Sequence, residues 1–374
     1  ACDRLGLMVW CETALVNEVT FSEAFHDNML QQAREMIAQR RNHPSIVIWG
    51  LFNEIYSGSK HKAGTIEPYL RDLRDLFHAI DPSRKVVAAS NQYGRKELSQ
   101  VPDFCAFNVY PAWYDVRPWY FRRLDRGGRM MRELLETLRE KNELKSIGIG
   151  EYGAGGSIHR HNNDPFHALP YYQHDDAEEY QAAYHYCNYR AIRDDDKVWG
   201  SFIWQMFDSG SDLQHEPGRP GCNTKGLVEF DHQTPKDAFY FYKAVWNPEP
   251  MLHLTGSRKK SVTNLTTVVF GFCNAGKVEF FLNGEKYGEQ TPDDLAAVVW
   301  ENVPLKPGKN TIELKCGNLM ERMTLQAPDR VRIAADEQNP VTAFKAAAAK
   351  LGPAGGVIEF EHGEYRIPES SATD

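Results

Sequence analysis

Apolar residues in the first 250 positions follow two spacings in turn, which predicts alternating strands and helices. Continuous apolar runs are typical of strands buried on both faces, and apolar residues three and four positions apart are typical of amphipathic helices. The predicted strands are 6–10, 46–52, 86–89, 104–110, 146–151 and 198–204. The predicted helices are 25–37, 66–80, 131–138 and 176–193. This alternation predicts an α/β fold with a parallel sheet.

The spacing of the strands favours a barrel over an open sheet. Glu54 and Glu151 are 97 residues and three strand–helix steps apart, or about 32 residues per step, and a (β/α)8 barrel spends about 31. A doubly wound sheet fits the alternation too, but it usually has a glycine-rich turn after its first strand, and none is visible. Six strands can be counted instead of eight. Either two are missed, or the chain begins inside a barrel.

The pattern changes after residues 246–250, where alternation with a period of two replaces the helical spacing. The alternating run 277–282 is followed by Asn283-Gly284, the strongest short hairpin signal. We therefore expect a TIM-barrel domain over 1–248 and an all-β sandwich of immunoglobulin type over 249–326.

Residues 327–374 are predicted to be a linker and tail, with the start of a further domain as the alternative. A helix is expected at 343–350, followed by extended runs at 355–360 and 362–367. Over a short match this tail resembles the opening of pectin-lyase-like right-handed β-helix domains. A terminal helix and hairpin explain the pattern equally well.

Composition and charge argue against several classes of partner. The 374 residues carry a net charge of −8, so neither nucleic acid nor an anionic membrane is expected to bind. No apolar run approaches the roughly 20 residues that a membrane-spanning helix needs. The seven cysteines have no CxxC spacing, so we expect neither a metal site nor a disulfide framework.

Two of the predicted strands end on a glutamate, Glu54 and Glu151. In a barrel, the C-terminal ends of the strands form the rim where active sites lie, and burial there can raise the pKa of a carboxyl group. Two acids across such a rim can cleave a glycosidic bond, because one protonates the leaving oxygen while the other attacks carbon or activates water. The alternative for Glu54 is a cap on the following helix.

Three further residues share this position at strand ends. Asn53 could donate a hydrogen bond to a sugar hydroxyl, and Trp204 could stack under a sugar ring. Tyr110 could donate to the carboxylate of Glu151 and keep it ionised. For Trp204 and Tyr110 the alternative is plain core packing.

Several ordered motifs resemble glycoside hydrolase family 2. Residues 42–54 (Asn-His-Pro-Ser-Ile-x2-Trp-Gly-x2-Asn-Glu) are similar to its acid/base motif, and Gln39 fits its β-galactosidase branch. Residues 151–155 (Glu-Tyr-Gly-Ala-Gly) resemble the nucleophile motif of the seventh strand, and residues 204–208 (Trp-Gln-Met-Phe-Asp) resemble the eighth-strand motif. The stretch that closes the family's barrel is similar to residues 221–228 and 235–243.

The resemblance implies a retaining mechanism with double displacement. Glu54 on the fourth strand would be the acid/base and Glu151 on the seventh the nucleophile, with their carboxyl groups about 5–5.5 Å apart. Asn53 would bind the sugar 2-hydroxyl, and Asp208 is a further expected substrate-binding residue. No cofactor and no metal are required, and the partner would be an oligosaccharide or glycoside.

The identity of the sugar stays open at this level. Asn223 and Lys225 form an Asn-x-Lys pair that resembles the pair with which β-glucuronidases of this family grip the sugar carboxylate, and lysine suits a carboxylate. Similar residues occur in the galactosidase branch. We therefore predict a β-galactosidase, with β-glucuronidase or β-galacturonidase as the alternative.

The resemblance aligns residues 5–10 with the third barrel strand, so this chain is expected to hold strands three to eight. N-terminal domains or another chain would complete the barrel. Cys11 stands where the family usually has aspartate. An inactive or interaction-only fragment is therefore a second alternative, and a periplasmic or extracellular location is expected by family habit alone.

Overall fold

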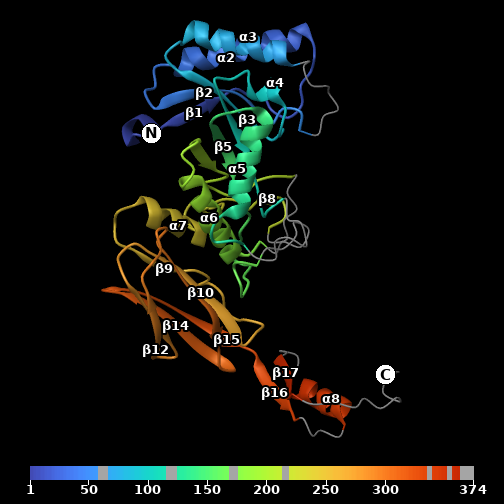
Figure 1. Cartoon of the computed structure of the whole chain (residues 1–374), viewed down its shortest axis with the longest axis vertical. Coiled ribbons are helices and arrows are strands. Elements are labelled where there is room, and N and C mark those ends of the chain that lie inside the picture. The colour runs from blue at the N-terminus through green and yellow to red at the C-terminus, as the bar shows by residue number, and fades with distance from the viewer. Residues whose placement is uncertain are drawn as a thin grey trace. The chain divides into compact units, whose positions relative to one another are not determined.

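The computed structural model describes residues 1–57, 66–114, 124–167, 176–212, 219–334, 339–351 and 356–362 (Figure 1). The chain forms two compact units, which are described separately. The first is built from Ala1–Ala154 and Cys187–Met206. The second is built from Gly155–His167, residues 176–186 and the chain from Phe207 onward.

A six-stranded parallel sheet with the order β1-β2-β3-β4-β5-β6 forms the first unit. Its strands are β1 (Val9–Glu12), β2 (Ile46–Asn53), β3 (Lys85–Ser90), β4 (Phe104–Asn108), β5 (Ile147–Tyr152) and β6 (Val198–Ile203). The helices that follow the first five strands are α2 (Glu23–Arg40), α3 (Glu67–Ile80), α4 (Lys96–Ser99), α5 (Arg129–Asn142) and α6 (Glu178–Arg193). The predicted barrel architecture, with strands three to eight present, is confirmed.

The sheet is curled, because side chains of its two outer strands meet. The ring of Trp10 on β1 lies 6.3 Å from that of Trp199 and 5.3 Å from that of Phe202, both on β6, between centroids. In a flat sheet, six strands would place β1 and β6 about 24 Å apart. Gly50 on β2 makes room on this inner face, since a Cβ atom there would lie 2.2 Å from Trp10 Nε1 and 2.6 Å from Glu12 Cγ.

The opposite face of β2 carries the helices. Trp49 is completely buried and packs 5.8 Å from Phe77 of α3, between ring centroids. Its indole N–H donates to Asp81, just after α3, at 3.0 Å. Leu51 and Leu73 are also fully buried in this cluster, and α2 and α3 lie side by side over it (Figure 1). The apolar run predicted from 46 onward is therefore a strand, and it is buried on both faces from Trp49 to Phe52, whereas Val47 is 38% exposed.

The start of the first strand was predicted wrongly. Residues Cys2–Leu5 form the short helix α1, which Gly6 ends with a φ of 69°. Leu7 and Met8 are 52% and 80% exposed, so the sheet begins only at Val9. A short apolar run after a glycine does not reveal whether it is buried.

Two antiparallel sheets follow in the second unit, with the orders β13-β10-β9 and β12-β11-β14-β15. Their strands are β9 (Leu252–Leu254), β10 (Thr266–Cys273), β11 (Val278–Leu282), β12 (Glu285–Gln290), β13 (Ala297–Pro304), β14 (Gly308–Cys316) and β15 (Leu319–Ala327). Phe280 and Trp300 meet across the sheets at 5.2 Å. Asn283 and Gly284 have φ angles of 54° and 86°, as the predicted hairpin requires. The immunoglobulin-like sandwich is confirmed.

Three smaller parts complete the second unit. Helix α7 (Asp237–Trp246) precedes the sandwich, and β7 (Ser209–Gly210) pairs with β8 (Cys222–Asn223). At the end of the chain, β16 (Asp329–Ile333) pairs in parallel with β17 (Gly356–Phe360) across helix α8 (Pro340–Leu351). The start of the expected linker is therefore a strand. The extended run predicted at 362–367 lies outside the described residues except for His362.

We predict that Gly50→Ala lowers the free energy of unfolding by about 1–3 kcal/mol, because the added methyl group overpacks the inner face. Gly210→Ala is the matched control, since a Cβ atom there meets nothing within 4 Å. Its effect should stay within about 0.5 kcal/mol. Urea unfolding of the three proteins measures both changes, and equal stability of the two variants would contradict the packing argument.

Candidate active site

Glu54 and Glu151 lie at the same end of the parallel sheet. Glu54 directly follows β2, and its backbone N–H donates to the carbonyl of Ala89 on β3 at 2.9 Å. Its φ of 50° is uncommon for a residue other than glycine. Glu151 is the next-to-last residue of β5. The two predicted acids therefore share the C-terminal edge of one sheet.

Asn108 joins the two acids, although the sequence analysis did not select it. It ends β4, and its amide Nδ2 donates to Glu54 Oε1 at 2.8 Å and to Asn53 Oδ1 at 3.0 Å. Asn108 also pairs in register with Glu151 on the neighbouring strand. Gly150 makes the space for it, because a Cβ atom there would lie 2.5 Å from Asn108 Oδ1. One amide side chain therefore holds Glu54 and stands beside the strand position of Glu151.

Tyr110 makes the predicted contact with Glu151. Its hydroxyl donates to Glu151 Oε2 at 2.5 Å. Burial keeps the pKa of Tyr110 well above its ordinary value, and the negative charges of Glu151 and Glu54 raise the pKa further. The hydroxyl therefore stays protonated and remains a donor.

Glu12 is a third acid at this edge, and the sequence analysis did not select it either. It ends β1, and its pKa is raised to about 7, first by burial and then by the negative charge of Glu151. Glu12 follows the same rule as Glu54 and Glu151, since all three lie at the ends of apolar strands. An acid at the end of an apolar run was therefore visible in the sequence at Glu12 too, although only Glu54 and Glu151 were predicted as site residues.

Trp204 presents an accessible ring just beyond β6. Its backbone N–H donates to the carbonyl of Tyr152 at the end of β5, at 2.9 Å. The residue is 38% exposed, which leaves part of the indole open for stacking. Stacking on a sugar stays a prediction.

The other three predicted residues belong to the second unit and are buried there. Asp208, Asn223 and Lys225 are 2%, 8% and 1% exposed. The side chain of Asn223 accepts a hydrogen bond from the backbone N–H of Lys225 at 3.1 Å, which holds the pair in one local turn. Their contacts with substrate stay predictions.

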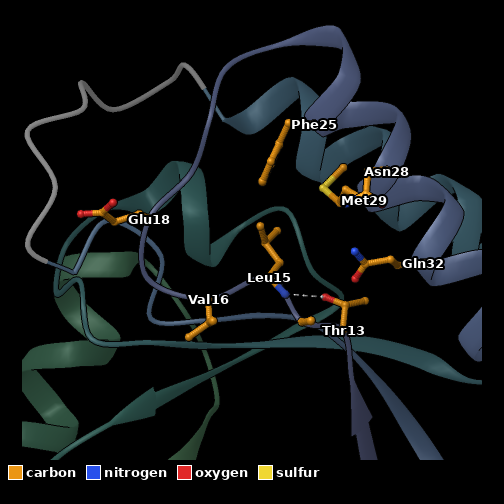
Figure 2. A pocket seen from close by; sticks show the side chains of 9 residues that line it. Thr13, Leu15, Val16, Glu18, Phe25, Asn28, Met29 and Gln32 are labelled. Atoms are coloured by element: carbon orange, nitrogen blue, oxygen red, sulfur yellow. Dashed lines mark hydrogen bonds between the residues drawn. The ribbon is translucent and has the colours of Figure 1, made fainter. Parts of the chain in front are cut away.

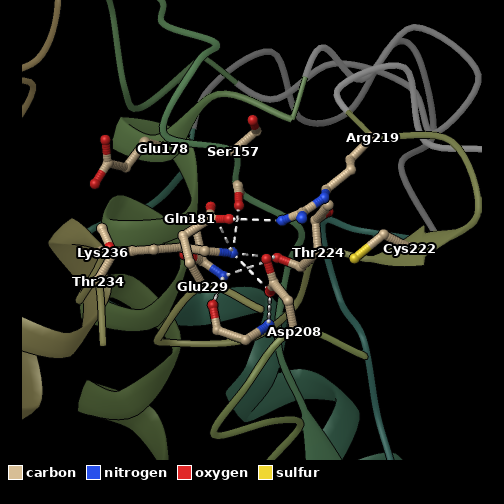
Figure 3. A network of polar contacts seen from close by, with 12 residues as sticks. Ser157, Glu178, Gln181, Asp208, Arg219, Cys222, Thr224, Glu229, Thr234 and Lys236 are labelled. Atoms are coloured by element: carbon tan, nitrogen blue, oxygen red, sulfur yellow. Dashed lines mark hydrogen bonds and ion pairs between the residues drawn. The ribbon is translucent and has the colours of Figure 1, made fainter. Parts of the chain in front are cut away.

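Asp208 belongs to a polar cluster centred on Lys236 (Figure 3). Asp208 Oδ1 accepts from Lys236 Nζ at 2.7 Å and from the backbone N–H of Gly226 at 2.8 Å. Burial raises the pKa of Asp208 to about 6, and the charge of Lys236 limits the rise while that of Glu229 adds to it. Lys236 lies in the stretch 235–243 that resembles the family, but its sequence context did not predict a role for its side chain.

A small hollow in the first unit is a poor alternative site. It is lined by Thr13, Ala14, Leu15, Val16, Glu18, Phe25, Asn28, Met29 and Gln32 (Figure 2). Its volume of about 80 Å³ is well below the roughly 300 Å³ of an ordinary ligand pocket. A hollow of this volume has room for a few water molecules but is too small for a sugar ring.

The described residues offer little for a metal, a disulfide or a membrane. No three of their His, Cys, Asp and Glu side chains are grouped so that they could hold a metal ion. All seven cysteines are free. None of the helices in the described ranges has the length and apolar character to cross a membrane.

We predict that Glu12→Gln stabilises the protein at high pH and leaves its stability nearly unchanged at pH 4. The folded protein holds the Glu12 proton up to about pH 7, against 4.5 for an unperturbed side chain, so the wild type loses stability as the pH rises between these values. Glutamine keeps the uncharged form, and the gain at pH 8 should reach at most about 3 kcal/mol.

Urea unfolding at pH 4, 6 and 8 measures this gain, with Glu136→Gln on α5 as the control because Glu136 is exposed. A stability difference between Glu12→Gln and wild type that does not change with pH would contradict the prediction.

Comparison with protein families gives one match over most of the chain. The model described as "Glycosyl hydrolases family 2, TIM barrel domain" matches residues 1–249. A domain of unknown function matches residues 265–316, inside the sandwich.

Individual relatives agree with this match. A β-glucuronidase of Bacteroides fragilis is 36% identical over 320 residues, which cover 83% of this chain and 44% of that protein. The crystal structure of an FMN-binding β-glucuronidase from Facaelibacterium prausnitzii L2-6 has a TM-score of 0.76 and 31% identity, covering 87% of this chain and 48% of that one. A structure named "putative beta-galactosidase", from Bacteroides fragilis, has a TM-score of 0.74 and 28% identity, covering 87% and 47%.

The chain spans less than half the length of each of these relatives. Its match to the family model nevertheless includes the whole parallel sheet and the strand ends that carry Glu54 and Glu151. The chain belongs to family 2 of the glycosyl hydrolases.

Proposed function

We propose that the protein containing this chain is a retaining exo-β-glycosidase that hydrolyses terminal β-glucuronides. The observation that carries the reaction type is the arrangement of Glu54 and Glu151 at one edge of the sheet. Each acid has its own neutral donor, Asn108 for Glu54 and Tyr110 for Glu151. Two carboxyl groups with different partners suit the two different roles of a retaining mechanism.

In the first step, Glu151 attacks the anomeric carbon and Glu54 gives its proton to the leaving oxygen. The bond to the aglycone breaks, and an ester forms between Glu151 and the sugar. In the second step, Glu54 takes a proton from water, the water oxygen attacks the same carbon, and Glu151 leaves as a carboxylate. The Tyr110 hydroxyl, which stays protonated, holds one oxygen of Glu151 in place while the other attacks.

The β-galactosidase predicted from the sequence is not confirmed, and the β-glucuronide alternative is better supported. Relatives named β-glucuronidase include one that is 36% identical, whereas a structure named for galactosidase activity is 28% identical. The Asn223 amide and the Lys225 ammonium are also the groups expected to bind a sugar carboxylate, through charge-assisted hydrogen bonds. A neutral galactoside offers no such charge to Lys225.

We predict that 4-nitrophenyl β-D-glucuronide is the best of four aryl glycosides (the glucuronide, galacturonide, galactoside and glucoside). Its kcat/KM should be at least about tenfold above those of the neutral galactoside and glucoside, since a charged contact is worth about 1.5–3 kcal/mol. Glu151→Gln should lower the rate on every substrate by at least about 10³-fold. Glu136→Gln is the control and should keep full activity. A faster galactoside would overturn the proposed sugar, and no hydrolysis of any substrate would favour the interaction-only alternative.

We predict that Tyr110→Phe lowers kcat by about 10–100-fold, because it removes a hydrogen bond to a charged group. The variant should affect kcat more than KM, since the lost bond aims Glu151 and does not bind the sugar. Steady-state kinetics on the best substrate measure the two constants. Tyr287→Phe on β12 is the matched control, and equal effects of the two substitutions would argue against this role for Tyr110.

A further inference from the structure

One buried lysine connects three segments of the second unit (Figure 3). Lys236 is 0% exposed. Its ammonium donates to the carbonyl of Gly156 at 2.6 Å, to Asp208 Oδ1 at 2.7 Å and to the carbonyl of Thr224 at 3.0 Å. An ammonium group has three N–H donors, so this cluster uses all of them.

The segment that Lys236 binds carries the proposed carboxylate-binding pair. Thr224 lies between Asn223 and Lys225, and its carbonyl also accepts from the backbone N–H of Gly156 at 3.0 Å and from Gln181 Nε2 at 3.4 Å. The backbone immediately before Lys225 is therefore held by three donors.

The backbone immediately after Lys225 is held by the same cluster. The N–H of Gly226 donates to Asp208 Oδ1 at 2.8 Å, and its carbonyl accepts from Gln181 Nε2 at 3.0 Å. The contact is close, because a Cβ atom on Gly226 would lie 2.2 Å from the backbone nitrogen of Asp208. Lys236 and Asp208 thus fix the chain on both sides of Lys225.

The energetics of the pair point to positioning. Both side chains are buried, 0% and 1% exposed, and moving an ammonium and a carboxylate out of water costs about as much as their attraction returns. Such a pair contributes little net stability compared with apolar side chains of the same size. What it does supply is a set of directional bonds that apolar side chains cannot make.

We propose that Lys236 and Asp208 are positioning residues for substrate selection: they hold the backbone on both sides of Lys225, so that Lys225 and Asn223 present their polar groups to the carboxylate of a uronic acid. The inference rests on the proposed function. It assigns the preference for a charged sugar to two residues that need not touch the sugar.

The test compares kcat/KM for the aryl β-glucuronide with that for the neutral aryl glycoside that the wild type hydrolyses fastest, in the intact protein. This ratio does not depend on the fraction of folded enzyme. Lys236→Met should lower the ratio about 10–100-fold, as should Lys225→Met, and Lys236→Arg should restore part of it. Lys259→Met is the matched control, because Lys259 is also buried and donates to a backbone carbonyl, that of Asn162, at 3.0 Å.

Lys236→Met alone leaves Asp208 as an uncompensated buried charge, which can prevent folding. The double variant Lys236→Met, Asp208→Asn removes both charges, and it should fold and show the same loss of preference. An unchanged ratio in the folded variants would overturn the inference, as would an equal loss in Lys259→Met. Failure of the proposed function is read separately, from a wild type that shows no preference for the glucuronide.

Discussion

The meeting of Glu54 and Glu151 at one edge of the sheet depends on the parallel pairing of β2, β3, β4 and β5. In a parallel sheet every strand ends at the same edge, so the pairing alone brings residues that are far apart in the sequence together there. Glu54 and Glu151 are 97 residues apart, yet Asn108 bonds to the first and pairs in register with the second. A shift of one residue in the register of β4 would turn Asn108 to the other face of the sheet and separate it from Glu54.

Small residues on the inner face make this register possible. Gly50 admits Trp10 and Glu12, and Gly150 admits Asn108, each at a distance that a methyl group would block. The polar edge and the aromatic contact between β1 and β6 are therefore consequences of the same packing rule. At both positions, a large side chain that points inward from one strand lies next to a glycine on the neighbouring strand.

Much of this arrangement could be predicted from the sequence, because strand ends are local features. The apolar runs before Glu54 and Glu151 located both acids, and the position of Tyr110 at a strand end led to its bond with Glu151. Asn108 was missed because a single amide in an apolar strand gives no local sign of its partner, which lies 54 residues away. The start of β1 and the strand β16 were missed for a related reason, since the burial of a short apolar run is decided by what packs against it.

Buried charges are stabilised in different ways in the two polar clusters, the one at the edge of the parallel sheet and the one around Lys236. At the edge of the parallel sheet, neutral donors hold the carboxyl groups of Glu54 and Glu151, and burial together with the negative charge of Glu151 raises the pKa of Glu12 to about 7. Around Lys236, the ammonium group is met by the Asp208 carboxylate and two backbone carbonyls, and the Glu229 carboxylate lies 3.9 Å away. A neutral donor leaves a reactive charge free to change during a reaction, whereas an ion pair with all its bonds used resists change. The first arrangement suits groups that react, and the second suits a rigid scaffold.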